Sequence, residues 1–252
     1  MEYTINLRPI NKGKLLAAAD VKFENQFKLN GVKVFAGKEE GTIFTQMPSY
    51  QKLDPVTGIR GYMPVVVLSK GLNERVRNSI QEMFDKTVFN ISSNPSYLSR
   101  ENQRVLDVLV KNVTPFTNDV NNPNLRGFAN IAISELGSEN KIHINSIRII
   151  EAVNQESGQN YLAVSMPRAK VAEKGGTFAY SDQCHSITTD LRIAIHQGVI
   201  SEYKQKIGDY TIEDGLNEGK TNTERNFNEQ TLNHEVEQDL NIDAHAEMEI
   251  IE

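Results

Sequence analysis

The chain contains an internal repeat, and this feature constrains its fold more than any other in its 252 residues. Residues 27–35 (FKLNGVKVF) align with residues 142–150 (IHINSIRII), and both segments alternate apolar and polar positions as a half-buried strand does. Shorter matches flank this pair in the same order, residues 19–23 with 129–133 upstream and residues 43–48 with 162–167 downstream. Because order and spacing both hold, we infer a tandem duplication.

Each copy ends in a segment with the spacing of an amphipathic helix. The apolar stripe of the first is Leu72, Val76, Ile80 and Met83 or Phe84, and that of the second is Leu191, Ile195, Val199 and Tyr203. Thr188 or Thr189 is placed to cap the second helix. Several strands followed by one helix predict an α+β fold rather than alternating strands and helices. We therefore expect two tandem small domains, each an antiparallel β-sheet with a C-terminal helix.

These patterns divide the chain into four parts. We assign a first copy to residues 1–86, a polar linker to 87–102, a second copy to 103–207 and a tail to 208–252. The linker assignment depends on a run of polar residues that contains one proline.

Turn signals predict hairpins at Asn30-Gly31, Gly37–Gly41 and Gly137–Asn140. The segment Leu106–Val113 is ambiguous, because Ser99 is placed to cap a helix that would include it. The repeat register matches this segment with Ile5–Ile10 instead, so we predict a strand.

The net charge of −6 hides two opposite parts. Residues 208–252 carry 13 acidic and 2 basic side chains, whereas residues 1–207 carry 20 acidic and 25 basic ones, a net charge of +5. The last segment has too few apolar residues to offset the entropy of ordering, so we expect a disordered acidic tail. This tail either keeps the chain soluble or competes electrostatically for the basic body. The body itself is compatible with an anionic partner.

The second copy contains Asp182-Gln-Cys-His185-Ser-Ile187, followed by Arg192 in the predicted helix. This segment resembles the Asp-x-Ala-His-Pro-Ile-Asn motif of the SpoVG (stage V sporulation protein G, septation protein) family, with the helix arginine at the same spacing. The first copy keeps Met47-Pro48-Ser49 but has Lys70-Gly71 where the family has His-Pro. Ser186 replaces the family's proline in the second copy.

The resemblance covers about residues 1–86 and 103–206, and it implies a small α+β domain that pairs through sheet edges. It also implies a bacterial regulator of septation, sporulation and gene expression that binds DNA, RNA or both. We expect the two copies to pair as an intramolecular pseudo-dimer, which would cover an edge strand; a homodimer of two chains is the alternative. The alternative function is a protein-interaction scaffold in cell division that does not bind nucleic acid.

The candidate nucleic-acid contacts are basic residues. The resemblance places them in the loop after each Met-Pro step and around the following helix. They are Lys52, Arg60, Lys70, Arg75 and Arg77 in the first copy, and Arg168, Lys170, Lys174, His185 and Arg192 in the second. The alternative is that they are ordinary solvated side chains. Tyr50, Tyr62 and Phe178 lie near these loops and either stack on unpaired bases or belong to the packed sheet faces. Because the first loop is less basic, we expect the second copy to dominate binding.

The sequence contains no pattern typical of an enzyme or a metal site. Gly-rich dinucleotide motifs, phosphate loops and nucleophile elbows are absent, and the histidines lack metal-ligand spacing. The single cysteine, Cys184, excludes an internal disulfide and is expected to be a buried core residue. The N-terminal residues lack a signal-peptide pattern, and no apolar run is long enough to span a bilayer. We therefore expect a cytoplasmic, non-enzymatic protein without a cofactor.

Overall fold

The computed structural model describes residues 1–53, 58–86, 88–93, 104–116, 123–155, 157–172 and 177–217. The first half forms β1 (Tyr3–Lys12), β2 (Leu15–Phe23), β3 (Phe27–Ala36), β4 (Ile43–Gln46), β5 (Ser49–Leu53), β6 (Arg60–Pro64), β7 (Val66–Leu68), α1 (Lys70–Asp85) and β8 (Asn90–Ser92). The second half forms β9 (Leu106–Pro115), β10 (Leu125–Glu135), β11 (Lys141–Val153), β12 (Asn160–Ser165), β13 (Arg168–Ala172), β14 (Phe178–Asp182), β15 (Cys184–Ser186) and α2 (Thr189–Asn217). Among these elements, the order from β1 to α1 recurs from β9 to α2, and β8 has no counterpart.

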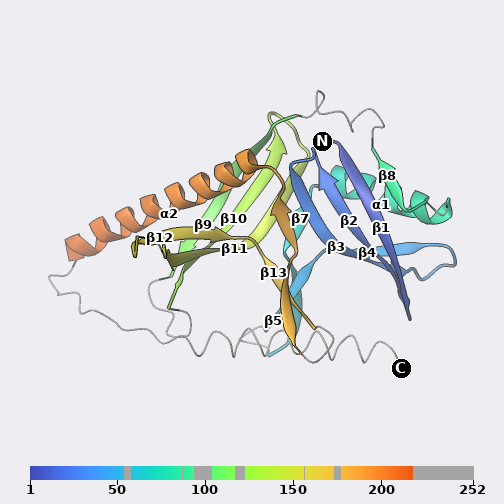
Figure 1. Ribbon diagram of the computed structural model, residues 1–252, viewed down its shortest axis with the longest axis horizontal. Helices are drawn as coiled ribbons and strands as arrows, with labels where there is room; N and C mark the ends of the chain where they lie inside the picture. The colour runs from blue at the N-terminus through green and yellow to red at the C-terminus, as the bar shows by residue number, and fades with distance from the viewer. Residues whose placement is uncertain are drawn as a thin grey trace.

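Two antiparallel sheets lie side by side, one from each half (Figure 1). The first contains β1, β2 and β3, with β4 paired to β3 and β8 paired to β1; the second runs β12-β11-β10-β9. The strand predicted at Leu106–Val113 is confirmed as β9, and the predicted turns at Gly37–Gly41 and Gly137–Asn140 join β3 to β4 and β10 to β11. The fold is therefore α+β, as the sequence patterns predict.

The two halves exchange one short strand each. β7 of the first half pairs with β11 of the second, and β15 of the second half pairs with β3 of the first. The same backbone hydrogen bond recurs on both sides, since Asn145 N–H donates to the Val65 carbonyl at 2.8 Å and Asn30 N–H donates to the Gln183 carbonyl at 2.9 Å. The halves therefore pair through sheet edges within one chain, in an approximately twofold arrangement.

The hairpin predicted at Asn30-Gly31 is wrong. These residues lie inside β3, where Gly31 has a φ of 68° and the register with β2 shifts. Ser146 takes the corresponding place in β11, with a φ of 60°. The displaced Gly31 N–H donates to Asp20 Oδ1 at 3.0 Å, and the displaced Ser146 N–H donates to Asn130 Oδ1 at 3.1 Å. Because the displaced N–H finds a side-chain acceptor, the Asn-Gly signal forms a β-bulge rather than a turn.

The helices cover the sheets with the apolar stripes predicted from their spacing. The buried residues are Leu72, Val76, Ile80 and Met83 in α1, and Leu191, Ile195, Val199, Ile200 and Tyr203 in α2. The Thr188 hydroxyl accepts the N–H of Leu191 at 3.4 Å, as expected of a cap. Buried residues from both halves form one continuous cluster, to which the fully buried Cys184 belongs as predicted. The two halves therefore share a single core.

The chain between and after the two copies contains more regular structure than its composition indicates. The predicted linker, residues 87–102, includes β8, which pairs with β1, and Leu7 N–H donates to the Phe89 carbonyl at 2.8 Å. Polar side chains are compatible with this strand because only its backbone must find ladder partners. α2 continues to Asn217, past the predicted start of the tail at residue 208, and residues 218–252 lie outside the described residues. In the part of the chain that the structure describes, no helix is long and apolar enough to cross a membrane.

Candidate nucleic-acid interface

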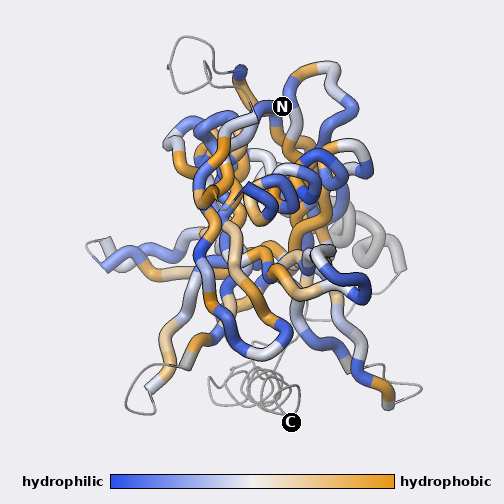
Figure 2. The backbone as a smooth tube through the Cα atoms, turned by 90° about the vertical axis from the view of Figure 1, so that its right-hand side faces the viewer, coloured by the Kyte–Doolittle hydropathy of each residue, from blue (hydrophilic) through white to orange (hydrophobic). Residues whose placement is uncertain are grey.

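Two β-hairpins project from the body. The first arm consists of β5 and β6 and the second arm of β13 and β14, and each is a two-stranded sheet of its own. Each arm follows a Met-Pro step, where proline ends the preceding ladder because it has no N–H to donate. Both arms extend from the same side of the body (Figure 1) and diverge from each other (Figure 2). The basic segments predicted from the sequence are thus carried on one side of the molecule.

The second arm gathers cations and aromatic rings on one face. Arg168 is opposite Asp182 and Lys170 is opposite Tyr180, and because alternate rows share a face, Phe178 lies on the same face. Arg168 Nε is 2.7 Å from Asp182 Oδ1, and Lys170 Nζ is 4.2 Å from the centre of the Phe178 ring. Phe178 is 47% exposed and Tyr180 is 55% exposed. Exposed rings beside cations are the arrangement on which unpaired bases stack.

The first arm is less basic on the corresponding face. Gln51 takes the place of Lys170, and its Nε2 donates to the Tyr62 hydroxyl at 2.9 Å. Arg60 shares the face of the exposed Tyr62, whereas Lys52 lies in the neighbouring row and points to the other face. The two predicted cations of this arm are therefore on opposite sides of the ribbon.

Tyr50 does not present its ring to solvent as an open platform. It is half-buried, and its hydroxyl lies 3.3 Å from the Ser146 hydroxyl on β11 of the other half. Tyr50 therefore attaches the first arm to the second sheet, whereas Tyr62 and Phe178 are the exposed aromatic residues of the three considered from the sequence.

The other predicted contacts are distributed over the helices and an exchanged strand. They are Lys70, Arg75 and Arg77 on α1, His185 on β15 and Arg192 on α2, while Lys174 lies outside the described residues. The Arg75 guanidinium donates to the Met1 carbonyl at 3.4 Å, and His185 Nδ1 lies 3.4 Å from Asn30 Nδ2 of the other half. The structure thus brings Arg168 and Lys170 together on one face but does not gather the full predicted set into one patch.

One arginine at the root of the second arm was not singled out from the sequence. Arg148 on β11 is half-buried and stands opposite Ser165, the last residue of β12 before the Met-Pro step into the arm. Burial lowers the pKa of its guanidinium; the nearby Tyr180 opposes this shift and the nearby Arg168 adds to it. Its sequence signal is only that of a polar position in the alternating pattern of residues 142–150, which does not separate it from an ordinary exposed side chain.

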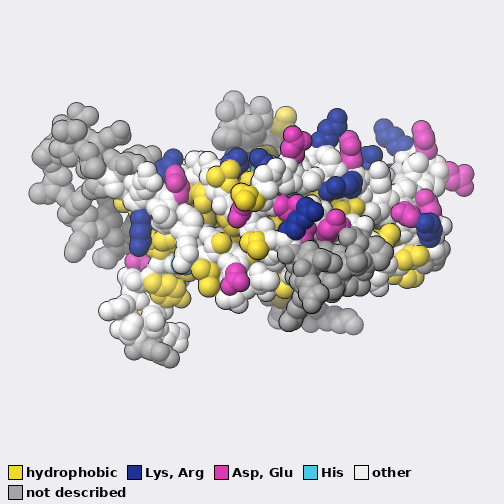
Figure 3. All heavy atoms as spheres, turned by 90° about the horizontal axis from the view of Figure 1, so that it is seen from above, with side chains coloured by type: hydrophobic (Ala, Val, Ile, Leu, Met, Phe, Trp, Pro, Cys, Tyr) yellow, Lys and Arg dark blue, Asp and Glu magenta, His cyan; other side chains and the backbone are white. Residues whose placement is uncertain are grey.

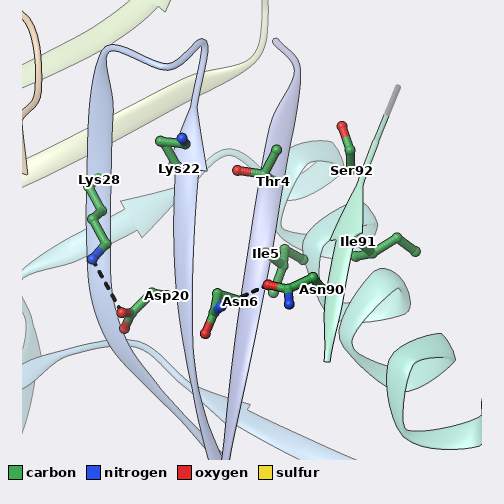
Figure 4. A pocket seen from close by; sticks show the side chains of 9 residues that line it. All are labelled: Thr4, Ile5, Asn6, Asp20, Lys22, Lys28, Asn90, Ile91 and Ser92. Atoms are coloured by element: carbon green, nitrogen blue, oxygen red, sulfur yellow. Dashed lines mark hydrogen bonds and ion pairs between the residues drawn. The ribbon is translucent and has the colours of Figure 1, made fainter. Parts of the chain in front are cut away.

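A shallow polar hollow lies on the outer face of the first sheet (Figure 4). Lys22 on β2 and Lys28 on β3 project into it and stand opposite each other in the sheet (Figure 4). Thr4 on β1 and Ser92 on β8 continue the same row of residues across the next two strands. Lys28 Nζ is 3.3 Å from Asp20 Oδ2. These lysines also occupy polar positions of alternating strands, and they form a second basic region that the motif analysis missed.

Asp20 anchors this hollow as a charged carboxylate. Burial alone would raise its pKa, but the Gly31 N–H and the charges of Arg8 and Lys28 outweigh burial and hold the pKa below the ordinary value of 3.8. Arg8 Nη2 is 3.1 Å from Asp20 Oδ1. The Asp20 carboxylate therefore pairs with both Arg8 and Lys28 and also accepts the Gly31 N–H in the bulge of β3.

The side of the body opposite the arms carries charges of both signs (Figure 3). Basic and acidic side chains are interspersed over it, together with apolar ones (Figure 3). Within the described residues, no group of three or more His, Cys, Asp or Glu side chains is placed to hold a metal ion. The second arm, where Arg168 and Lys170 share a face with the exposed Phe178 and Tyr180, is the arrangement best suited to an anionic partner with aromatic bases.

Comparison with known proteins matches one part of the chain to a family. Residues 104–205 match the family model described as SpoVG. No curated protein and no solved structure matches the chain. The matched segment extends from the start of the second half into α2, and it includes Arg148 and the whole second arm.

Proposed function

We propose that this chain is a regulatory protein that binds DNA or RNA with its two arms, because residues 104–205 match the SpoVG family model. The first half repeats the same order of elements, and we propose that it is a second SpoVG-like unit. In this proposal the protein is not an enzyme and needs no cofactor. Its role is to control gene expression linked to septation or sporulation.

The observation that supports binding is the face of the second arm. Arg168 and Lys170 supply cations for backbone phosphates, whose neutralisation provides most of the affinity of such complexes. Phe178 and Tyr180 are exposed beside them, and exposed rings on a hairpin face cost free energy in water unless a partner covers them. Cations and aromatic rings lie on the same face, an arrangement that suits a nucleic-acid strand with its phosphates and bases.

The twofold arrangement adds a second point of contact. Because both arms extend from one side of the body, a single nucleic acid can engage them together (Figures 1 and 2). Once one arm is bound, the second contact is intramolecular, which raises the overall affinity without further interactions.

Binding is tested by fluorescence anisotropy with labelled DNA and RNA oligonucleotides, single-stranded and duplex, between 50 and 200 mM salt. We expect the logarithm of the association constant to fall with the logarithm of the salt concentration, by about 0.9 per phosphate contact on duplex DNA. Absence of binding to every oligonucleotide at the lowest salt would refute the proposal. If the chain binds no oligonucleotide but captures a protein partner at every salt concentration, the result would support the interaction scaffold instead.

A charge-reversal series locates the interface. R168E/K170E should weaken binding more than K52E/R60E, because Arg168 and Lys170 share one face with two exposed aromatic rings, whereas Lys52 and Arg60 lie on opposite faces of the first arm. K38E/K86E is the matched control, since it changes the net charge equally at two exposed positions outside the arms. Equal losses in all three variants would show that only the overall charge matters.

A further inference from the structure

Two arginines in the described part of the chain are half-buried, and they differ in their partners. Arg126 on β10 forms an ion pair with Glu151 of β11 and donates to the Pro123 carbonyl at 2.6 Å. Arg148 on β11 has no carboxylate partner among the described residues. A guanidinium that is partly removed from water without a counter-charge costs free energy, because nothing replaces the solvation it loses.

The surroundings of Arg148 make this cost larger. Arg168, at the start of the second arm, is a like charge that adds to the lowering of the pKa of Arg148, and Tyr180, in the next row of the same face of that arm, opposes it. Asp182, the carboxylate of this arm, is already paired with Arg168 at 2.7 Å. The root of the second arm therefore has an excess of positive charge with hydrogen-bond donors beside it.

We propose that Arg148 binds a backbone phosphate of the nucleic acid, together with Arg168 and Tyr180, at the root of the second arm. A phosphodiester accepts two parallel hydrogen bonds from a guanidinium, and the planar fork of arginine suits this geometry. The inference rests on the proposed function, because it names the contact that anchors nucleic acid to the arm.

The approximate twofold relation supports this location. Lys33 on β3 stands opposite Gln46 as Arg148 stands opposite Ser165, so both halves place a cation at the same register position. Each half also places a tyrosine at the same register position of its arm, Tyr62 in the first and Tyr180 in the second. The first half has Ser49 in place of Arg168, so the site of the second half has one more cation.

The test is Arg148→Met in the full chain, with Arg126→Met as the matched control. Binding of a mixed-sequence single-stranded 20-nucleotide DNA should weaken about tenfold for R148M, since a charge-assisted hydrogen-bonded contact is lost. Its salt slope should fall by about 0.7. R126M should bind as the original chain does. Equal affinity of R148M and the original chain would overturn the inference.

Stability separates a binding role from a structural one. R148M should raise the melting temperature by about 2–4 °C, because an unpaired half-buried charge is replaced by an apolar side chain. R126M should lower it, because Glu151 loses its partner. Arg148→Lys keeps the charge without the fork and should bind with intermediate affinity. A lower melting temperature for R148M would show that Arg148 is structural and would overturn the inference.

Inorganic phosphate distinguishes failure of the inference from failure of the proposed function. If the original chain binds no oligonucleotide, the proposed function fails, and the site is judged by phosphate alone. A rise in melting temperature with phosphate that R148M loses supports the oxyanion site, and an equal rise in both chains overturns it. Equal competition by a polyglutamate peptide at matched charge would overturn the assignment to nucleic acid.

Discussion

Replacement of Ile144 by alanine tests whether the two halves unfold as one unit. Ile144 is 0% exposed on β11 and stands opposite Val66 of β7, the strand contributed by the other half. Truncating a buried isoleucine to alanine costs about 2–5 kcal/mol, and because this site is fully enclosed we expect about 3.5 kcal/mol. In a folded unit of this size, that loss corresponds to a decrease of about 7–14 °C in melting temperature.

Calorimetry and hydrogen exchange measure the two aspects of this prediction. Calorimetry should show one transition in both proteins, shifted in I144A. Hydrogen exchange with mass spectrometry should show that peptides from β2–β3 lose as much protection as peptides from β10–β11, because the core is continuous. Leu109→Ala, at a 53% exposed position on β9 of the same sheet, is the control and should cost less than about 0.5 kcal/mol. Two calorimetric transitions, with only one displaced in I144A, would refute the shared core.

Three further predictions concern Asp20, the acidic segment and Cys184. D20N should have a free energy of unfolding about 1–2 kcal/mol lower than the original chain at pH 7, measured by urea unfolding. Because the folded pKa of Asp20 lies below 3.8, the original chain should keep this advantage above pH 3.8 and lose it as the pH falls through the folded pKa. A difference in stability that persists at the lowest pH would argue against a charge effect. Deletion of residues 218–252, which spares α2, should strengthen oligonucleotide binding in the anisotropy assay if the acidic segment competes for the arms, and an unchanged dissociation constant would leave it a solubilising role. Burial raises the pKa of the Cys184 thiol, and the side chain is 0% exposed. A thiol reagent should therefore modify Cys184 only at the rate of unfolding. Rapid labelling of the folded chain would contradict the place of Cys184 in the core.

The strands and helices were predictable where their periodicity is long. The alternating segment at residues 142–150 lies within β11, and the stripes that begin at Leu72 and Leu191 are the buried faces of α1 and α2. These patterns report on one element at a time, so the side that faces the core can be identified without knowing what it packs against.

Short and polar segments were less predictable. β8 is three residues long and lies in a polar stretch, so it has no periodic signal of its own. Asn30-Gly31 carries a strong local turn signal, but the Asp20 carboxylate, which accepts the Gly31 N–H, stabilises the bulge instead. In both cases the backbone partner comes from another element, which local propensity does not report.

The candidate site shows the same division. The basic segments after each Met-Pro step were found from the sequence, and the second of them is a hairpin with Arg168 and Lys170 on one face. Arg148 comes from a different strand, and its importance depends on a carboxylate that is missing around it. Such a property belongs to a neighbourhood in space, and no spacing along the chain reveals it.

Residues near one another in the chain are enough to predict the repeated order of strands and helix, the α+β class, the apolar faces of the helices and the opposite charges of the body and the acidic end. The fold is needed to see that β7 and β15 exchange between the halves, that one core serves both, and that an arginine without a carboxylate partner lies at the root of the second arm. The physical reason is the range of the interactions. Periodicity and charge density depend on residues near in sequence, whereas edge pairing and the solvation of a half-buried charge depend on residues that only the fold brings together.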